Sequence, residues 1–138
     1  MSHMPRVIVL DSWSIIAYLE DELAGERVAG VIADAHESGI PLLMAIVNVG
    51  EVWYILARET SEPEADQKIN QLQELGIEFI QPDWKLTREA AYFKSKNKMS
   101  YVDCFAAALA KQRKAHLITG DQEFKQVEHE VLINWMGA

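Results

Sequence analysis

The chain has 138 residues, of which 49% are hydrophobic and 25% charged, as in an ordinary globular protein of one domain. Its 21 acidic residues against 13 basic ones give a net charge of −8 at pH 7, which argues against a general polyanion-binding surface. No apolar run approaches the roughly 20 residues that a membrane-spanning helix needs, so we expect no membrane association.

The start of the chain and its single cysteine bear on the expected cellular location of the protein. The segment MSHMPRVIVL lacks the long apolar region and the cleavage site of a secretory signal peptide. Residues 1–3 resemble an expression-vector remnant, which leaves residues 4–138 as one domain. Cys104, the lone cysteine, excludes an internal disulfide and a multi-cysteine zinc site, so we expect a cytoplasmic protein.

Short apolar segments alternate with helical patterns along the whole chain. In chain order we expect a strand at 6–10, helices at 13–19 and 23–36, a strand at 42–45, helices at 47–58 and 61–75, a strand at 77–80, helices at 83–96 and 101–112, a strand at 116–119 and a candidate fifth strand at 131–133. No hairpin turn joins two strands. This order predicts an α/β fold, a short parallel β-sheet of four or five strands with helices on both faces.

Four carboxylates stand in apolar surroundings, each in a separate segment. They are Asp11 after RVIVL, Glu51 in IVNVGEVWYIL, Asp103 in SYVDCFAAALA and Asp121 in HLITGDQEF. An ionised carboxylate taken out of water is costly unless it gains a partner, and no Lys or Arg recurs beside all four. A hard divalent cation would compensate several carboxylates at once. The pattern therefore favours a site for one or two Mg²⁺ or Mn²⁺ ions.

The positions of these acids support a shared site. Asp11 and Asp121 directly follow predicted parallel strands, and ligands bind at that edge of an α/β sheet. Asp103 lies in the first turn of its helix, where the helix dipole favours an anion. Each of the three also has a simpler interpretation: Asp11 as a helix cap, Asp103 as a complement to the dipole, and Asp121 as a turn residue that caps a QEF helix. Glu51 resists such an explanation, because an apolar helix gains nothing from an internal acid.

The ordered set V-L-D-S-W, N-V-G-E-V, Y-V-D-C-F-A-A-A-L-A and L-I-T-G-D-Q-E-F resembles a PIN domain, most closely the VapC-type toxins of toxin–antitoxin pairs. The resemblance implies a small parallel sheet flanked by helices, and cleavage of RNA with Mg²⁺ or Mn²⁺. The residues that it assigns to catalysis and metal binding are Asp11, Glu51, Asp103 and Asp121. We expect the first three as direct ligands, and Asp121 as the ligand of a second ion or as a group that orients a bound water.

Further residues follow from the same resemblance. It implies that Ser12, Asn48 and Thr119 contact the ligands or the substrate. Trp13 and the pair Trp53–Tyr54 are bulkier than the small aliphatic residues usual at these places, which could narrow the cleft or alter the choice of partner.

Candidate surfaces for partners are less specific. The densest basic stretch could line an RNA path towards Asp103, although a solvated helix face explains it equally well; it comprises Arg88, Lys94, Lys96 and Lys98. Apolar residues of the first two helices could form a groove for an antitoxin or a homodimer face, or simply belong to the core; they are Trp13, Ile16, Tyr18, Leu19, Val28 and Ile32.

The carboxylate pattern predicts a Mg²⁺- or Mn²⁺-dependent enzyme, and the resemblance implies an endoribonuclease that leaves a 5′-phosphate and acts as the toxin of a toxin–antitoxin pair. A housekeeping RNA-processing nuclease on the same fold and a catalytically idle protein- or RNA-binding module remain alternatives. The chain has no HExxH, G-x-S-x-G or glycine-rich phosphate motif. A phosphoaspartate enzyme would carry a second acid two residues after Asp11, where this chain has Trp13.

Overall fold

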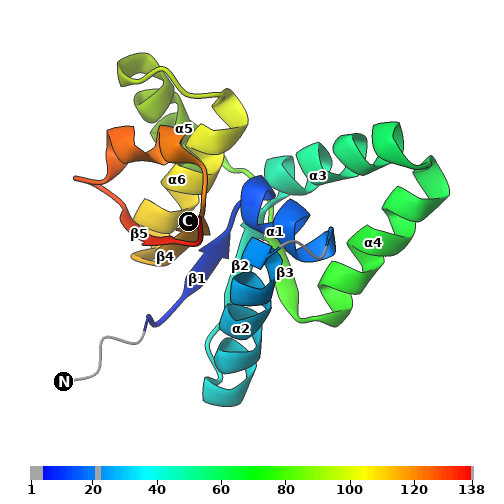
Figure 1. The fold of residues 1–138 in the computed structure, drawn as a ribbon. Coiled ribbons are helices and arrows are strands. Elements are labelled where there is room, and N and C mark those ends of the chain that lie inside the picture. The colour runs from blue at the N-terminus through cyan, green and yellow to red at the C-terminus, as the bar shows by residue number, and fades with distance from the viewer. Residues whose placement is uncertain (1–4, 21–22, 138) are drawn as a thin grey trace.

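Five short strands form one parallel sheet in the computed structural model, which describes residues 5–20 and 23–137 (Figure 1). The strands are β1 (Ile8–Leu10), β2 (Leu42–Ala45), β3 (Ile77–Ile80), β4 (His116–Thr119) and β5 (Leu132–Trp135), in the spatial order β3-β2-β1-β4-β5. All neighbouring pairs are parallel. The expected α/β fold is confirmed. The expected vector remnant at residues 1–3 lies outside the described residues.

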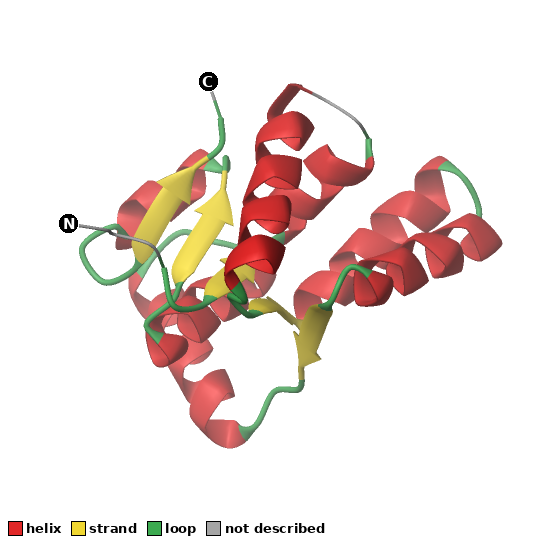
Figure 2. Cartoon of the chain, turned by 90° about the horizontal axis from the view of Figure 1, so that it is seen from below, coloured by secondary structure: helices red, strands yellow, loops and turns green. Residues whose placement is uncertain are grey.

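The helices connect these strands. They are α1 (Ser12–Leu19), α2 (Leu23–Ser38), α3 (Ile46–Glu59), α4 (Glu62–Glu74), α5 (Trp84–Lys96) and α6 (Tyr101–Arg113), with a 3₁₀ helix η1 (Gln122–Val127) between β4 and β5. Figure 2 shows the α1–α2 pair and the α3–α4 pair as two helical hairpins. In the part of the chain that the structure describes, no helix is long and apolar enough to cross a membrane.

Alternate residues of the central strands enter two different cores, which is why β1 and β2 are buried throughout. Val9, Leu43 and Leu117 pack with α5 and α6, whereas Ile8, Leu42 and Ile118 pack with α1 to α4. Helices therefore cover both faces of the sheet, and the short strands between them are held from either side.

The strand order reverses at β1. From β1 the chain moves to β2 and β3 on one side, and later returns to β4 and β5 on the other side. The carboxyl ends of β1 and β4, which pair through Leu10 and Ile118, therefore open at a topological switch point. Residues that follow these two strands are brought together there, although they are far apart in the sequence.

Some element bounds differ from the sequence prediction, and β1, for example, covers only Ile8–Leu10 of the strand expected at 6–10. β5 begins at Leu132, one residue later than predicted, because the Val131 N–H donates a hydrogen bond to the Val127 carbonyl in the preceding turn. Pairing then runs from His116 with Leu132 to Thr119 with Trp135. The 3₁₀ helix η1 is absent from the expected order of elements, because its six residues are too few to show a helical period, although the capping role considered for Asp121 places a short helix at QEF.

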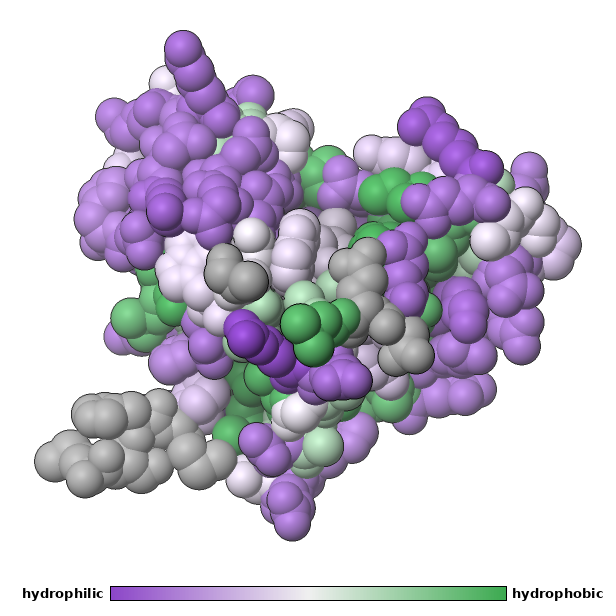
Figure 3. All heavy atoms as spheres, viewed as in Figure 1, coloured by the Kyte–Doolittle hydropathy of each residue, from purple (hydrophilic) through white to green (hydrophobic). Residues whose placement is uncertain are grey.

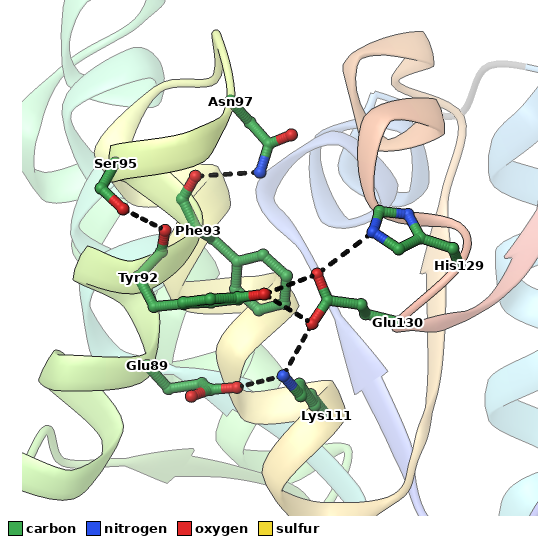
Figure 4. A network of polar contacts seen from close by, with 8 residues as sticks. All are labelled: Glu89, Tyr92, Phe93, Ser95, Asn97, Lys111, His129 and Glu130. Atoms are coloured by element: carbon green, nitrogen blue, oxygen red, sulfur yellow. Dashed lines mark hydrogen bonds and ion pairs between the residues drawn. The ribbon is translucent and has the colours of Figure 1, made fainter.

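A polar network ties the turn before β5 to α5 and α6 (Figure 4). Lys111 Nζ lies 2.7 Å from a Glu89 carboxylate oxygen and 2.9 Å from one of Glu130. The Tyr92 hydroxyl donates to Glu130, and the Lys111 ammonium lies 4.9 Å from the centre of the Tyr92 ring. The hydrogen bond from Lys111 lowers the pKa of the Glu130 carboxyl. This network lies on the face of the sheet covered by α5 and α6.

The crossing of α1 and α2 depends on one glycine. A Cβ added to Gly25 would overlap the backbone carbonyl of Ala17, whereas one added to Gly30, also in α2, would meet nothing within 4 Å. We expect Gly25→Ala to lower the free energy of unfolding by about 1–3 kcal/mol, because the helices must separate. The matched Gly30→Ala should raise it by about 0.5–1 kcal/mol. Urea denaturation measures both, and an equal effect of the two substitutions would contradict the close crossing.

Candidate metal site

Asp11 occupies the switch point between β1 and β4. It follows β1 directly and caps α1, where its Oδ1 accepts a hydrogen bond of 2.8 Å from the Ser14 backbone N–H. Its Oδ2 accepts one of 2.5 Å from the Thr119 hydroxyl, at the end of β4. The residue is only 1% exposed, and this burial raises the pKa of its carboxyl to about 7. Asp11 therefore joins the two strand ends and is costly to ionise.

Thr119 also positions Asp121. Its buried Oγ1 accepts a hydrogen bond of 3.0 Å from the Asp121 backbone N–H. Asp121 in turn caps η1, since its Oδ1 accepts from the Glu123 backbone N–H at 2.9 Å. The simple capping roles considered for Asp11 and Asp121 are thus real. The same hydrogen bonds also fix both carboxylates at one edge of the sheet.

Asp103 enters the same region from α6. Its backbone N–H donates to the hydroxyl of the cap residue Ser100 at 3.1 Å, and the side chain is 8% exposed. Carboxylate oxygens of Asp103, Asp121 and Glu123 lie within 4.8 Å of one another, and we call these three residues the acidic group. Burial, a hydrogen bond with Glu123 and the nearby charges of Asp121 and Asp11 raise the pKa of Asp103 to about 8.

A second set of contacts links α1 to α3. The Asn48 side-chain amide donates to the Ser12 hydroxyl at 3.1 Å, and this hydroxyl lies 3.3 Å from the Asn48 backbone carbonyl. Asn48 is fully buried, and its Oδ1 has no hydrogen-bond partner among the described residues. Glu51 lies nearly one turn further along α3, where its carboxylate accepts a hydrogen bond of 3.4 Å from the Tyr54 hydroxyl. Asn48 thus fixes the start of α3, from which Glu51 extends.

These residues surround a cleft of about 440 Å³. Its polar lining consists of Ser12, Glu51, Ser100 and the acidic group, and its apolar lining of Trp13, Ile16, Ala17 and Ile55. In the space-filling view, strongly hydrophilic atoms cover α5, whereas apolar atoms reach the surface over α3 (Figure 3). The cleft therefore combines a concentrated negative charge with an apolar wall.

The four predicted acids lie at the same edge of the sheet, in different surroundings. Asp103 and Asp121 belong to the acidic group, and Glu51 lines the same cleft outside that group. Asp11 is buried in the interior, where the charge of Asp121 raises its pKa, and its own charge in turn raises the pKa of Asp103. The sequence analysis did not select Glu123. Its signal was present two residues after Asp121 in LITGDQEF, but only the turn of η1 brings the two acids together.

The predicted RNA contacts are placed at the end of α5 and in the loop before α6. Arg88 is exposed on α5. Lys94 donates to the Met99 carbonyl at 2.6 Å, and the Lys96 ammonium lies 5.3 Å from the centre of the Tyr92 ring. Lys98 is exposed, and its backbone N–H bonds to the Gln126 side chain. The loop continues to Ser100, which lines the cleft. Lys96 and Lys98 are therefore close in sequence to a residue of the cleft wall.

The fold and the cleft define a class: a parallel α/β domain with carboxylates gathered at the carboxyl edge of its sheet. The chain belongs to the PIN domain family, whose model matches residues 8–130. The expected family is thereby confirmed. No curated protein matches the sequence.

Solved structures share this fold at low sequence identity. A chain of VapBC2 from Rickettsia felis, solved bound to a DNA fragment from its promoter, aligns with a TM-score of 0.76 and 13% identity over 93% of this chain and 97% of that one. VapBC-1 from nontypeable Haemophilus influenzae gives 0.72 and 16%, over 94% and 98%. VapC20 from Mycobacterium tuberculosis, described as a sarcin–ricin loop cleaving toxin, gives 0.67 and 17%, over 86% and 93%. The resemblance to VapC proteins thus extends over nearly the whole fold.

The raised pKa values predict a pH-dependent stability of the metal-free protein. Folded Asp103 keeps its proton up to about pH 8, whereas the unfolded chain releases it near pH 4, so the free energy of unfolding falls as pH rises between these values. Asp103→Asn should make this fall less steep and stabilise the protein at pH 8 by on the order of 2 kcal/mol. Asp34→Asn, at an exposed site on α2, is the control.

Thermal unfolding in EDTA at a series of pH values measures the effect. Some pH dependence should remain in Asp103→Asn, because burial also raises the pKa of Asp11 to about 7. Identical pH profiles for wild type and Asp103→Asn would show that the Asp103 carboxylate is not desolvated in the folded protein.

Proposed function

We propose that this protein is a Mg²⁺- or Mn²⁺-dependent endoribonuclease and the toxin of a toxin–antitoxin pair. The observation that carries the proposal is the acidic group, whose carboxylate oxygens lie within 4.8 Å of one another in an open cleft. Membership of the PIN family and similarity to VapBC structures along nearly the whole chain support it.

The donor set fits a hard divalent cation. Asp103, Asp121 and Glu123 offer only oxygen ligands, as Mg²⁺ and Mn²⁺ prefer. Their mutual repulsion contributes to the raised pKa of Asp103, and a bound dication would remove that cost. When bound, such an ion lowers the pKa of a coordinated water and stabilises charge that develops on a phosphodiester.

The protein's own residues would then hold and orient the RNA strand. The acidic group would hold the ion from the β4 and α6 side of the cleft, and Glu51 would complete the acidic lining from α3. Asp11 would act from below, because it fixes the Thr119 hydroxyl that in turn orients Asp121. Ser100 presents a hydroxyl group in the cleft wall that would donate to a phosphate oxygen, whereas the Ser12 hydroxyl, hydrogen-bonded to Asn48, would hold the wall in place. Hydrolysis in this arrangement would leave a 5′-phosphate.

The same comparisons support a proposal about the biological role. We propose a cognate antitoxin protein, a homodimeric assembly and a cytoplasmic location, as in a toxin that acts on cellular RNA. Growth arrest on expression, relieved by co-expression of a small neighbouring open reading frame, would distinguish a toxin from a housekeeping nuclease. Expression without any effect on growth would contradict the toxin role.

Metal-dependent RNA cleavage tests the activity. Wild type should cut a pool of structured RNAs with Mn²⁺ or Mg²⁺ and be inactive in EDTA. Asp103→Asn and Glu123→Gln should each reduce the rate at least about 100-fold, because each removes charge that holds the ion. Glu128→Gln, an exposed glutamate outside the cleft, is the control.

Calorimetric titration with Mn²⁺ separates binding from catalysis. Asp103→Asn and Glu123→Gln should weaken Mn²⁺ binding, whereas Glu128→Gln should not. A folded wild type that neither binds Mn²⁺ nor cuts RNA would favour the catalytically idle binding module. Cleavage in EDTA with 2′,3′-cyclic ends would show that the mechanism is wrong.

Lys96 and Lys98, which are close in sequence to the cleft-lining Ser100, give a separate prediction about RNA binding. Lys96→Glu combined with Lys98→Glu should weaken single-stranded RNA binding and make its log–log salt dependence shallower, by about 0.7 for each phosphate that the variant no longer neutralises. Lys68→Glu combined with Lys114→Glu makes the same charge change elsewhere and should have a smaller effect. Anisotropy titrations at several salt concentrations measure the slope. Equal slopes for both double variants would show that Lys96 and Lys98 do not contact the RNA.

A further inference from the structure

One wall of the cleft is apolar, although the phosphodiester chemistry proposed for it needs only polar groups. Trp13 is the largest side chain of this wall and faces the same cavity as Asp103, Asp121 and Glu123. A nucleotide has a charged phosphate and a flat apolar base, and the cleft offers one surface for each. The cleft as a whole therefore suits a ligand that combines a charged phosphate with a flat apolar base.

The ring of Trp13 is fixed directly beside the acidic group. Its Cζ2, Cζ3 and Cη2 atoms fill the space that a Cβ of Gly120 would occupy, so any larger residue at that position would displace the ring. Gly120 is the residue before Asp121. The packing therefore orders the indole and sets its place relative to the carboxylates, which lowers the entropy cost of stacking a base on it.

The indole N–H of Trp13 also distinguishes this residue. Among the described residues it donates no hydrogen bond, whereas the indole N–H groups of Trp53 and Trp135 donate to Asp66 and Glu128. Trp13 is only partly buried, and it lines the cleft. A tryptophan that served the core alone would not need to line this cavity.

We propose that Trp13 is a base-stacking platform that binds the unpaired base of a nucleotide next to the phosphate held at the acidic group. The preferred substrate is then a single strand or a loop, because a base within a duplex is already stacked on its neighbours. Stacking on an aromatic ring also tolerates every base and needs no positive charge, which suits a protein with a net charge of −8. This assignment deepens the proposed function and rests on it.

Abasic substrates test the proposal directly. After the cleavage site of a hairpin RNA with a mixed-sequence loop is mapped, an abasic nucleotide replaces each neighbour of the cut in turn. Wild type should lose about tenfold or more in kcat/KM at one of these positions, as expected when one base can no longer stack. Trp13→Leu should lose a similar factor on the intact RNA and nothing further on the abasic one.

Matched variants exclude a purely structural effect. Trp13→Phe should keep most of the discrimination against the abasic RNA, because it keeps an aromatic face. Trp84→Leu, the same substitution at a tryptophan that is 72% exposed on α5, should behave as wild type. If Trp13→Leu slows cleavage of intact and abasic RNA by the same factor as it slows duplex cleavage, Trp13 only supports the fold and the proposal is wrong.

A binding measurement separates this proposal from the nuclease assignment. If wild type cuts no RNA in Mg²⁺, the proposed activity fails, and the affinity of the same protein for intact and abasic single strands then decides about stacking. A preference for the intact strand that Trp13→Leu abolishes would support the platform. Equal affinity for both strands would overturn it.

Discussion

Asp11 and Asp103 stand where ionised carboxylates cost free energy, and the surrounding structure holds them there. Each is nearly inaccessible to water, and burial is the largest cause of its raised pKa. Such a site forms only if stronger interactions fix the backbone on every side. The two cores supply them, because alternate residues of β1 and β4, such as Val9 and Ile118, pack against helices on opposite faces of the sheet. The acidic cleft is thus destabilising locally and maintained by packing elsewhere.

The hydroxyl of Thr119 links the pairing of β1 and β4 to the positions of the carboxylates in the site. Because Leu10 of β1 pairs with Ile118 of β4, Thr119 lies opposite Asp11, the residue that follows β1. Its hydroxyl donates to Asp11 and accepts from the Asp121 backbone N–H, so both acids move only together. Asp121 then caps η1 and brings Glu123 towards Asp103. Sheet topology alone would place these segments near one another, and this chain of hydrogen bonds orders their carboxylates.

The sequence allowed most of this to be predicted where the signal is local. Asp11, Asp103 and Asp121 are recognisable because each follows an apolar strand or begins an apolar helix, and the strand–helix alternation then places them at one edge. Glu123 escaped prediction because a 3₁₀ turn has no periodicity in so short a segment. Glu51 was expected among the ligands from its apolar surroundings. Only the three-dimensional course of α3 shows that it lines the cleft apart from the acidic group.

The cleft has one acidic wall and one apolar wall, and this contrast bears on how so acidic a protein would bind a nucleic acid, as proposed above. A phosphate that approached the acidic group would be repelled unless a cation neutralised that group, so charge alone gives no attraction at long range. An apolar aromatic surface beside it attracts a base at any ionic strength, and it acts only at contact. The two interactions are therefore complementary. In the proposed function a cation would neutralise the acidic group so that a phosphate can bind, Trp13 would discriminate an exposed base from a paired one, and Gly120 leaves room for the Trp13 ring beside Asp121.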